Sequence, residues 1–142
     1  MVIEESIDIE APLDKVWKTF TDLTCWQDWN TIMKYISSDG KSIEKGANLK
    51  FCIRPFMVPI YIEPFIVEVV IGKLIVWSSS KFGIFAKHEF IFEESEKKTI
   101  VKSKESFKGI TVDRFPSLFP EKVIRSLTRS FLKDLKKFAE GE

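Results

Sequence analysis

One histidine, one serine and one glutamate have the types and spacing to act together on a ligand. His88 lies in the alternating stretch 84–93, and Ser103 and Glu105 lie in the alternating stretch 99–107. Successive side chains of a strand point to opposite faces, so all three fall on the apolar faces. The other residues on these faces are Ala86, Phe90, Phe92, Thr99, Val101 and Phe107. The parity therefore predicts three polar groups that point into an otherwise aromatic interior.

A wholly polar connection joins the two stretches and predicts a hairpin. In a register that sets Phe92 opposite Thr99, His88 lies opposite Ser103, and Glu105 is next along. A buried carboxylate is costly unless it is paired, so Glu105 is expected to contact a partner such as His88 or to lie at the wet end of a cavity. Burial alone would raise the pKa of the carboxyl and lower that of the histidine, whereas pairing would do the opposite to both.

Two interpretations of this polar group stay open. In the functional one, His88 and Glu105 grip the polar end of a mostly apolar ligand or shuttle a proton, as weak catalytic candidates. In the structural one, they satisfy each other. A catalytic triad that includes Ser103 is disfavoured, because neighbours on a flat sheet face rarely give the required geometry.

The elements that must position these residues follow from hydrophobic periodicity. A first strand has its apolar side chains at Ile3, Ile7 and Ile9, and Pro12 then opens a helix over 12–22. Further strands are predicted over 32–38, 49–53, 65–71 and 73–79, with a proline-rich loop over 54–64. An apolar stripe from Val123 to Phe138 predicts a final helix of about twenty residues. Consecutive strands with short connections indicate an antiparallel meander and the α+β class.

Several segments, in this order along the chain, resemble the START-like or Bet v 1-like superfamily, which includes a polyketide cyclase/dehydrase-like group. They are Ile7 to Pro12 with Val16-Trp17, Asp22 with Trp29-Asn30, Pro64, Leu74 to Trp77, His88 to Glu93, and Glu105 to Gly109. The family often has proline after the Trp-Asn pair, where this chain has Thr31. The resemblance implies one helix-grip domain over 1–142. In that fold a curved antiparallel sheet of about seven strands wraps around a long C-terminal helix, with two short helices after the first strand.

The resemblance also implies a cavity between the sheet and the long helix. Its expected ligand-binding lining is Trp26, Trp29, Phe51, Ile53, Val67, Val69, Trp77, His88, Phe90, Phe92, Val101, Ser103, Glu105, Phe107, Leu127 and Phe131. For each aromatic residue the alternative is that it fills the core. Family members include lipid and hormone binders, aromatic cyclases and chaperone partners, so the fold alone does not decide the function.

Composition narrows the classes of partner. With 22 basic and 21 acidic residues the net charge is +1, which gives no electrostatic case for nucleic acid. Cys25 and Cys52 lack the clustering of a metal site and are expected to be reduced thiols of a cytoplasmic protein. No signal peptide, membrane insertion, metal or cofactor is expected. The apolar loops 56–60 and 109–120 could close over a ligand or form a homodimer contact.

Three functions follow, in order of preference. The first is a binder or carrier of a small hydrophobic molecule, such as a lipid or a polyketide-like aromatic compound. The second is a cyclase- or dehydratase-like enzyme with His88 and Glu105 as acid–base residues. The third is a co-chaperone-like interaction module that uses the loop 56–60.

Overall fold

The computed structural model describes residues 1–141, apart from the side chain of Leu118. The strands are β1 (Val2–Ile9), β2 (Lys34–Ser38), β3 (Leu49–Ile53), β4 (Ile60–Ile62), β5 (Phe65–Val70), β6 (Leu74–Lys81), β7 (Ile84–Ser95) and β8 (Lys98–Lys108). The helices are α1 (Leu13–Thr21), η1 (Leu23–Cys25), α2 (Trp26–Trp29), α3 (Ile110–Arg114), η2 (Pro116–Leu118) and α4 (Glu121–Ala139).

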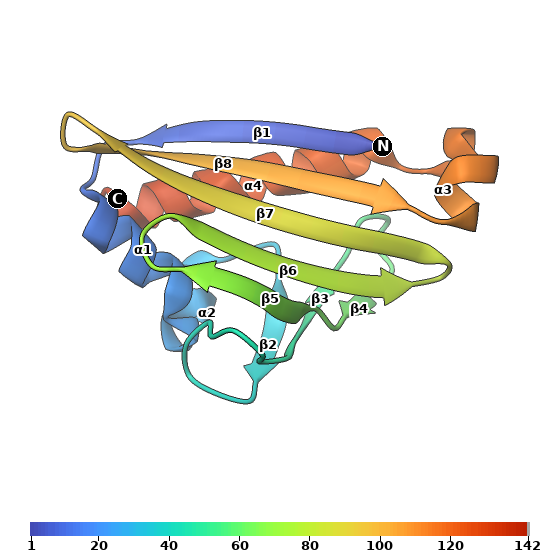
Figure 1. The fold of residues 1–142 in the computed structure, drawn as a ribbon, viewed down its shortest axis with the longest axis horizontal. Coiled ribbons are helices and arrows are strands. Elements are labelled where there is room, and N and C mark those ends of the chain that lie inside the picture. The colour runs from blue at the N-terminus through green and yellow to red at the C-terminus, as the bar shows by residue number, and fades with distance from the viewer. Residues whose placement is uncertain (142) are drawn as a thin grey trace.

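Two antiparallel sheets make up the wall of the molecule (Figure 1). The larger has the strand order β1-β8-β7-β6-β5 and the smaller has the order β2-β3-β4. They join at one corner, where Leu49 N–H donates to the Pro64 carbonyl at 2.8 Å and Ile66 N–H donates to the Ala47 carbonyl at 2.9 Å. The predicted α+β helix-grip class is confirmed. The described residues form eight strands rather than about seven, because β4 lies inside the stretch that was expected to be only a loop.

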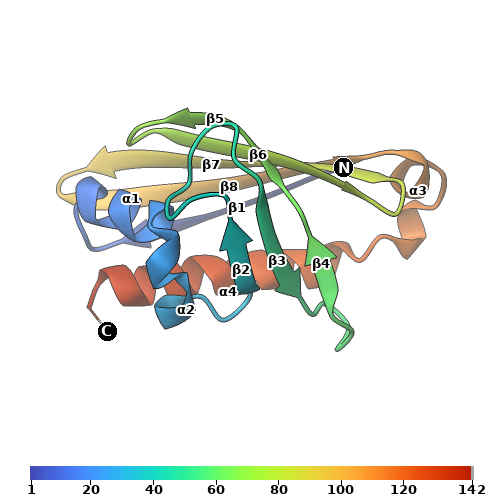
Figure 2. The same ribbon diagram turned by 90° about the horizontal axis from the view of Figure 1, so that it is seen from below.

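Helix α4 runs along the open side of the larger sheet and closes the interior (Figures 1 and 2). Its buried face consists of Thr128, Phe131, Leu132, Leu135 and Ala139, which recur at helical spacing. The opposite face is rich in lysine and arginine, as expected of a solvated surface. The position of α4 beneath the curved sheet leaves one interior space that side chains must either fill or line.

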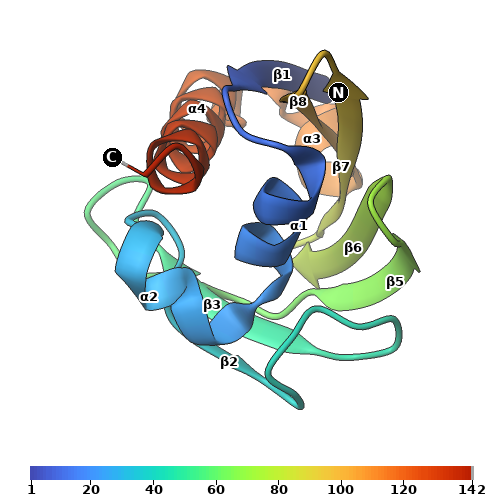
Figure 3. The same cartoon turned by 90° about the vertical axis from the view of Figure 1, so that its left-hand side faces the viewer.

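Helix α1 fills one end of this interior. Viewed from that end, α1 lies inside the ring formed by the strands and α4 (Figure 3). Val16 and Phe20, four residues apart, are fully buried. The Phe20 ring lies 4.8 Å from the Phe90 ring and 5.8 Å from both the Trp26 and Phe131 rings, between ring centroids. Such tilted and edge-on aromatic pairs pack this end densely.

The hairpin of β7 and β8 is longer than the sequence indicated, and its register differs by two residues. Glu96 and Lys97 form a two-residue turn with left-handed φ values of 51° and 69°, so pairing continues to Ser95 and Lys98. Two-residue hairpin turns of this twist need positive φ at both positions. The expected pairing of His88 with Ser103 is therefore wrong, and His88 lies opposite Glu105. A shift of two residues keeps every side chain on its predicted face.

Two further features concern the chain as a whole. Among residues 1–141, no helix is both long and apolar enough to span a bilayer. Cys25 and Cys52 are free thiols, of which Cys52 is buried.

Candidate functional site

A cavity of about 240 Å³ occupies the end of the interior that α1 leaves unfilled. It lies between β3, β4, β6, β7 and β8 and the first half of α4, and it opens toward the β3–β4 loop and the β6–β7 turn. The lining residues are Ile32, Met33, Phe51, Ile53, Pro55, Phe56, Ile60, Ile62, Trp77, Ser79, Lys81, Phe82, Ile84, Ala86, Lys87, His88, Glu105, Phe107, Phe119, Pro120, Ile124, Leu127, Thr128 and Phe131. An apolar wall with a few polar groups is the usual character of a small-molecule site.

The polar part of the wall is a row across three strands, completed by one helical residue. Trp77, His88 and Glu105 are cross-strand neighbours on β6, β7 and β8. His88 Nε2 lies 2.6 Å from Ser103 Oγ, and Thr128 Oγ1 hydrogen-bonds to Glu105 Oε1. The distance from His88 Nε2 to Glu105 Oε1 is 3.9 Å, too long for a hydrogen bond. Each of the two titratable groups therefore has its own hydroxyl partner.

The pKa shifts of His88 and Glu105 are caused by burial rather than by an ion pair between the two side chains. Desolvation raises the pKa of Glu105 to about 7, against a smaller lowering by the Thr128 hydrogen bond. Desolvation lowers the pKa of His88 to about 3, so the imidazole is neutral at physiological pH. These are the directions expected for burial alone, and the direct hydrogen bond between His88 and Glu105 that the structural interpretation assumed is absent.

Two atoms of this row remain open to a ligand. Glu105 Oε2 and His88 Nδ1 have no hydrogen-bond partner within the described residues, and neither is among the fully enclosed unpartnered atoms, which are Trp29 Nε1 and Asn30 Nδ2. Both residues line the cavity. The site can therefore accept a hydrogen bond at Glu105 Oε2, donate one from a protonated Glu105, and accept or donate one at His88 Nδ1 according to the tautomer of the ring.

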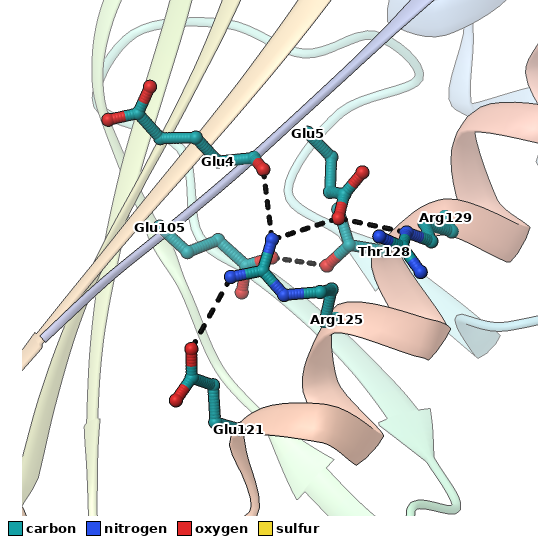
Figure 4. A network of polar contacts seen from close by, with 7 residues as sticks. All are labelled: Glu4, Glu5, Glu105, Glu121, Arg125, Thr128 and Arg129. Carbon is teal, nitrogen blue, oxygen red and sulfur yellow. Dashed lines mark hydrogen bonds and ion pairs between the residues drawn. The ribbon is translucent and has the colours of Figure 1, made fainter.

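A second polar network fixes α4 against β1 beside this row (Figure 4). Glu5 Oε1 accepts from Arg125 at 3.0 Å and from Arg129 at 2.9 Å. Arg125 also donates to the Glu4 carbonyl and to Glu121. Burial opposes ionisation of Glu5, but the two guanidinium groups hold its pKa below the ordinary value. Thr128 lies between Arg125 and Arg129 in sequence. The contacts of these two arginines with Glu5 therefore fix the position at which Thr128 meets Glu105.

The structure brings half of the sixteen expected residues into the cavity wall. These are Phe51, Ile53, Trp77, His88, Glu105, Phe107, Leu127 and Phe131. They come from β3, β6, β7, β8 and α4, as strand parity and the helical stripe indicated.

The remaining expected residues lie elsewhere. Trp26, Trp29, Phe90, Phe92, Val101 and Val69 belong to the packed core around α1, and buried Ser103 reaches the site only through His88. Trp26 and Trp29 therefore fill the core rather than line the cavity. Val67 is 42% exposed on the outer surface, so its expected inward orientation is wrong. A register shift between Ile66 and Glu68 is the reason, since it reverses the parity within β5.

Sequence reasoning missed several lining residues that the same patterns contain. Thr128 lies on the apolar stripe of α4, four residues after Ile124 and three before Phe131. Ser79 has the parity of Trp77, and it pairs with Ala86 across β6 and β7. A polar residue inside an apolar helical stripe was the available signal for Thr128.

The rim of the cavity exposes apolar side chains on two loops. Phe56, Met57 and Val58 on the β3–β4 loop are 57%, 89% and 61% exposed, and Phe82 on the β6–β7 turn is 73% exposed. The β3–β4 loop is therefore not folded onto its own sheet. In the segment 109–120, Val112 and Phe119 pack with Ile3 and Phe107 in a small second core.

Several solved structures share this fold. Truncated norcoclaurine synthase from Thalictrum flavum superposes with a TM-score of 0.76 at 12% identity, over 100% of this chain and 94% of that one. A protein of Thermus thermophilus gives 0.77 at 14% identity, over 98% and 97%. DynU16, a putative protein of the dynemicin biosynthetic locus, gives 0.73 at 13% identity; the match covers 99% of this chain but 47% of that one. At such identities the likeness establishes the fold alone.

No curated protein matches the sequence itself. The family model described as "Polyketide cyclase / dehydrase and lipid transport" matches residues 1–140. The match covers nearly the whole chain and agrees with the helix-grip architecture and the internal cavity. The chain belongs to the polyketide cyclase/dehydrase and lipid transport family.

Proposed function

We propose that the cavity binds a small hydrophobic molecule with one neutral polar group, and that this group contacts Glu105 and His88. The observation that supports it most directly is that His88 and Glu105, cross-strand neighbours on β7 and β8, lie side by side in a mostly apolar wall. Burial of the ligand's apolar body supplies affinity, at about 25 cal/mol per Å² removed from water. The polar row supplies orientation, because a ligand that leaves Glu105 Oε2 unmatched forfeits a hydrogen bond.

A matched pair of substitutions on β6 tests binding in the cavity. Ser79 lines the cavity, whereas its neighbour Ser80 is exposed on the other face. Ser79→Phe is expected to fill the space and weaken binding of the neutral fluorescent probe N-phenyl-1-naphthylamine by at least about tenfold. Ser80→Phe is expected to bind the probe like the wild type. Equal binding by both variants, or no binding by the wild type, contradicts the proposal.

A second comparison tests the polar row. We expect 2-naphthol to displace the probe at a lower concentration than naphthalene, because only the naphthol can hydrogen-bond to Glu105 or His88. One net hydrogen bond corresponds to a preference of roughly 3- to 10-fold. Glu105→Leu should reduce this preference while naphthalene binds as well or better. A preference that survives in Glu105→Leu and in His88→Phe would exclude the row as the polar contact.

A second candidate function is proton transfer on a bound substrate. The observation that favours it is the position of Glu105 on the cavity wall with its pKa raised by burial to about 7, close to the value that suits a general base or acid. The carboxylate would take a proton from carbon next to a carbonyl to form the enolate, exchange that proton with the solvent, and return a solvent hydrogen to the same carbon. Exchange of the α-hydrogens of 2-tetralone for deuterium, followed by NMR, should exceed the buffer rate and fall to it in Glu105→Gln. Exchange at the buffer rate in both proteins would leave binding without catalysis, and equal exchange above that rate would exclude Glu105 as the base.

A further inference from the structure

A groove on the outside of the small sheet adjoins the cavity through two shared residues. The groove has a volume of about 480 Å³ and is lined by Thr31, Ile32, Lys34, Tyr35, Cys52, Arg54 and Leu127. Ile32 and Leu127 also line the cavity. Figure 2 shows β2 and β3 of the small sheet, with α4 running past their ends. The two hollows therefore adjoin each other at Ile32 and Leu127.

The charge of the groove is one-sided. Its only ionisable side chains at neutral pH are Lys34 and Arg54. Lys34 pairs with Cys52 across β2 and β3, and Arg54 lies two residues beyond Cys52 on the same face, so the two cations are diagonal neighbours. Neither makes an ion pair with any described residue. Asp134 is not among the lining residues, and its carboxylate accepts hydrogen bonds from the backbone N–H and the hydroxyl of Thr31.

The backbone of the groove is held in an uncommon conformation. Tyr35 has a left-handed φ of 55°, and the pairing of β2 with β3 shifts register between Lys34 and Ser37. A non-glycine residue held there costs roughly 1–3 kcal/mol, and such residues cluster at ligand sites. The bulge keeps Tyr35 on the rim, where its side chain is 73% exposed.

We infer that this groove binds the anionic head of an amphiphile, a carboxylate or a phosphate, whose apolar tail enters the cavity between Ile32 and Leu127. This inference rests on the cavity-binding function proposed above and specifies its ligand class. Arg54 can bind either anion with two parallel N–H donors, and Lys34 adds a second charge. Both anions offer at least two acceptor oxygens to a guanidinium group, so the two cations favour a negative charge, and experiment distinguishes the two head groups.

Other positions suit an anionic head less well. Deep in the cavity it would face the carboxyl of Glu105, a like charge at high pH. The two lysines at the cavity rim are already engaged: Lys81 Nζ donates to the Tyr61 carbonyl at 2.5 Å, and Lys87 lies 3.1 Å from Glu89. Lys34 and Arg54 are the cations bordering either hollow that lack such partners within residues 1–141.

The test compares three ligands with the same ten-carbon tail: decanoate, decyl phosphate and neutral decanol. Each displaces N-phenyl-1-naphthylamine at pH 8 from the wild type, from Lys34→Gln/Arg54→Gln, and from Lys73→Gln/Lys137→Gln, a control that removes the same charge at exposed positions outside both hollows. Loss of two charge-assisted contacts is expected to weaken decanoate or decyl phosphate at least about tenfold in the groove variant only. Decanol should bind all three proteins equally, which also shows that they are folded.

The outcomes separate the two proposals. Weaker binding of both anions to the groove variant supports the inference. Weaker binding of one anion alone also supports it and identifies the head group. Equal affinity for both anions in the wild type and the groove variant overturns it, as does equal weakening in the control. If decanol and the probe bind, and Ser79→Phe blocks them, the cavity function stands even when the groove inference fails. If Ser79→Phe changes nothing, the cavity function fails instead.

Discussion

At the scale of residues, burial shifts the pKa values of Glu105 and His88 in opposite directions. Apolar surroundings disfavour charge, so Glu105 takes up a proton more readily and His88 less readily than in water. Ser103 supplies a neutral hydroxyl partner to His88 and Thr128 supplies one to Glu105, and neither hydrogen bond requires its partner to be charged. The result is a polar row that carries little charge below about pH 7 and can therefore face an apolar ligand.

Glu105 makes folding stability fall as the pH rises. Its pKa is 4.5 in an ordinary environment and about 7 in the fold, so between these values the native state holds a proton that the unfolded chain releases. Glu105→Gln removes this effect. Its free energy of unfolding relative to the wild type should rise by up to roughly 3 kcal/mol between pH 4.5 and pH 8. Urea denaturation at several pH values measures this, with the exposed Glu4→Gln as the control, and parallel pH profiles would contradict it.

His88, the chain's one histidine, gives a single NMR probe of the same environment. With its pKa lowered by burial to about 3, its ring nitrogens should keep the ¹⁵N chemical shifts of a neutral imidazole from pH 8 down to about pH 5, while Glu105 titrates beside it. The neutral ring also contributes stability above pH 6.5 that is lost progressively as the pH falls toward about 3, since the unfolded chain binds the proton first. A titration midpoint near 6.5 in the folded protein would show that the ring is solvated.

At the scale of elements, α4 is positioned by charge as well as by its apolar face. Glu5 on β1 accepts from Arg125 and Arg129, one turn apart on the helix, and this contact determines where Thr128 meets Glu105 (Figure 4). The β7–β8 hairpin is positioned differently, by a turn whose two residues both take left-handed φ. Each feature gives a prediction about the element that it holds.

Glu5→Gln should loosen α4 and perturb the cavity. The side chain of Glu5 is only 14% exposed, and its replacement by a neutral amide removes the negative charge that both guanidinium groups contact. We expect a loss of about 1–2 kcal/mol in the free energy of unfolding, more than for an exposed pair. This loss should disappear as the pH falls through the lowered pKa of Glu5, where the wild type also loses the charge. Glu93→Gln, which breaks an exposed pair with Lys102, is the control and should cost less than about 1 kcal/mol.

The turn offers a stabilising change. Asn-Gly is the preferred pair for a two-residue turn with positive φ at both positions, and Glu96 and Lys97 hold that conformation at some cost. Glu96→Asn/Lys97→Gly should raise the free energy of unfolding by roughly 1 kcal/mol, with no change in the cross-strand contacts between His88 and Glu105 protons in NMR spectra. A lower stability would indicate a different turn and a different register.

At the scale of the whole molecule, the interior is divided into a filled end and a hollow end. Phe20 from α1 packs against rings from α2, β6, β7 and α4 at the filled end. At the hollow end, residues such as Ile124 border the cavity and remain partly exposed. This division combines a packed core with an open cavity within the same interior.

Shortening a side chain should therefore lower the free energy of unfolding more at the filled end of the interior than at the hollow end. Phe20→Ala should cost about 3–5 kcal/mol, because it leaves a void in a packed aromatic cluster. Ile124→Ala should cost about 1 kcal/mol or less, since the side chain already borders open space, and it should enlarge the cavity. Urea denaturation of both variants measures the difference, and equal losses would show that the hollow end is as tightly packed as the filled one.

The sequence by itself determined the fold class, the inward faces of β7 and β8, and the presence of His88, Ser103 and Glu105 in an apolar interior. These follow from local periodicity, which any single strand or helix displays. Only the tertiary structure decided which rings fill space and which enclose it, because α1 plugs one end and not the other (Figure 3). It also decided the partners of the polar row. The hairpin register depends on the turn at Glu96-Lys97, and the outward position of Val67 depends on a bulge in β5. The contact of Thr128 with Glu105 depends on the placement of α4. None of these is a local property of the chain.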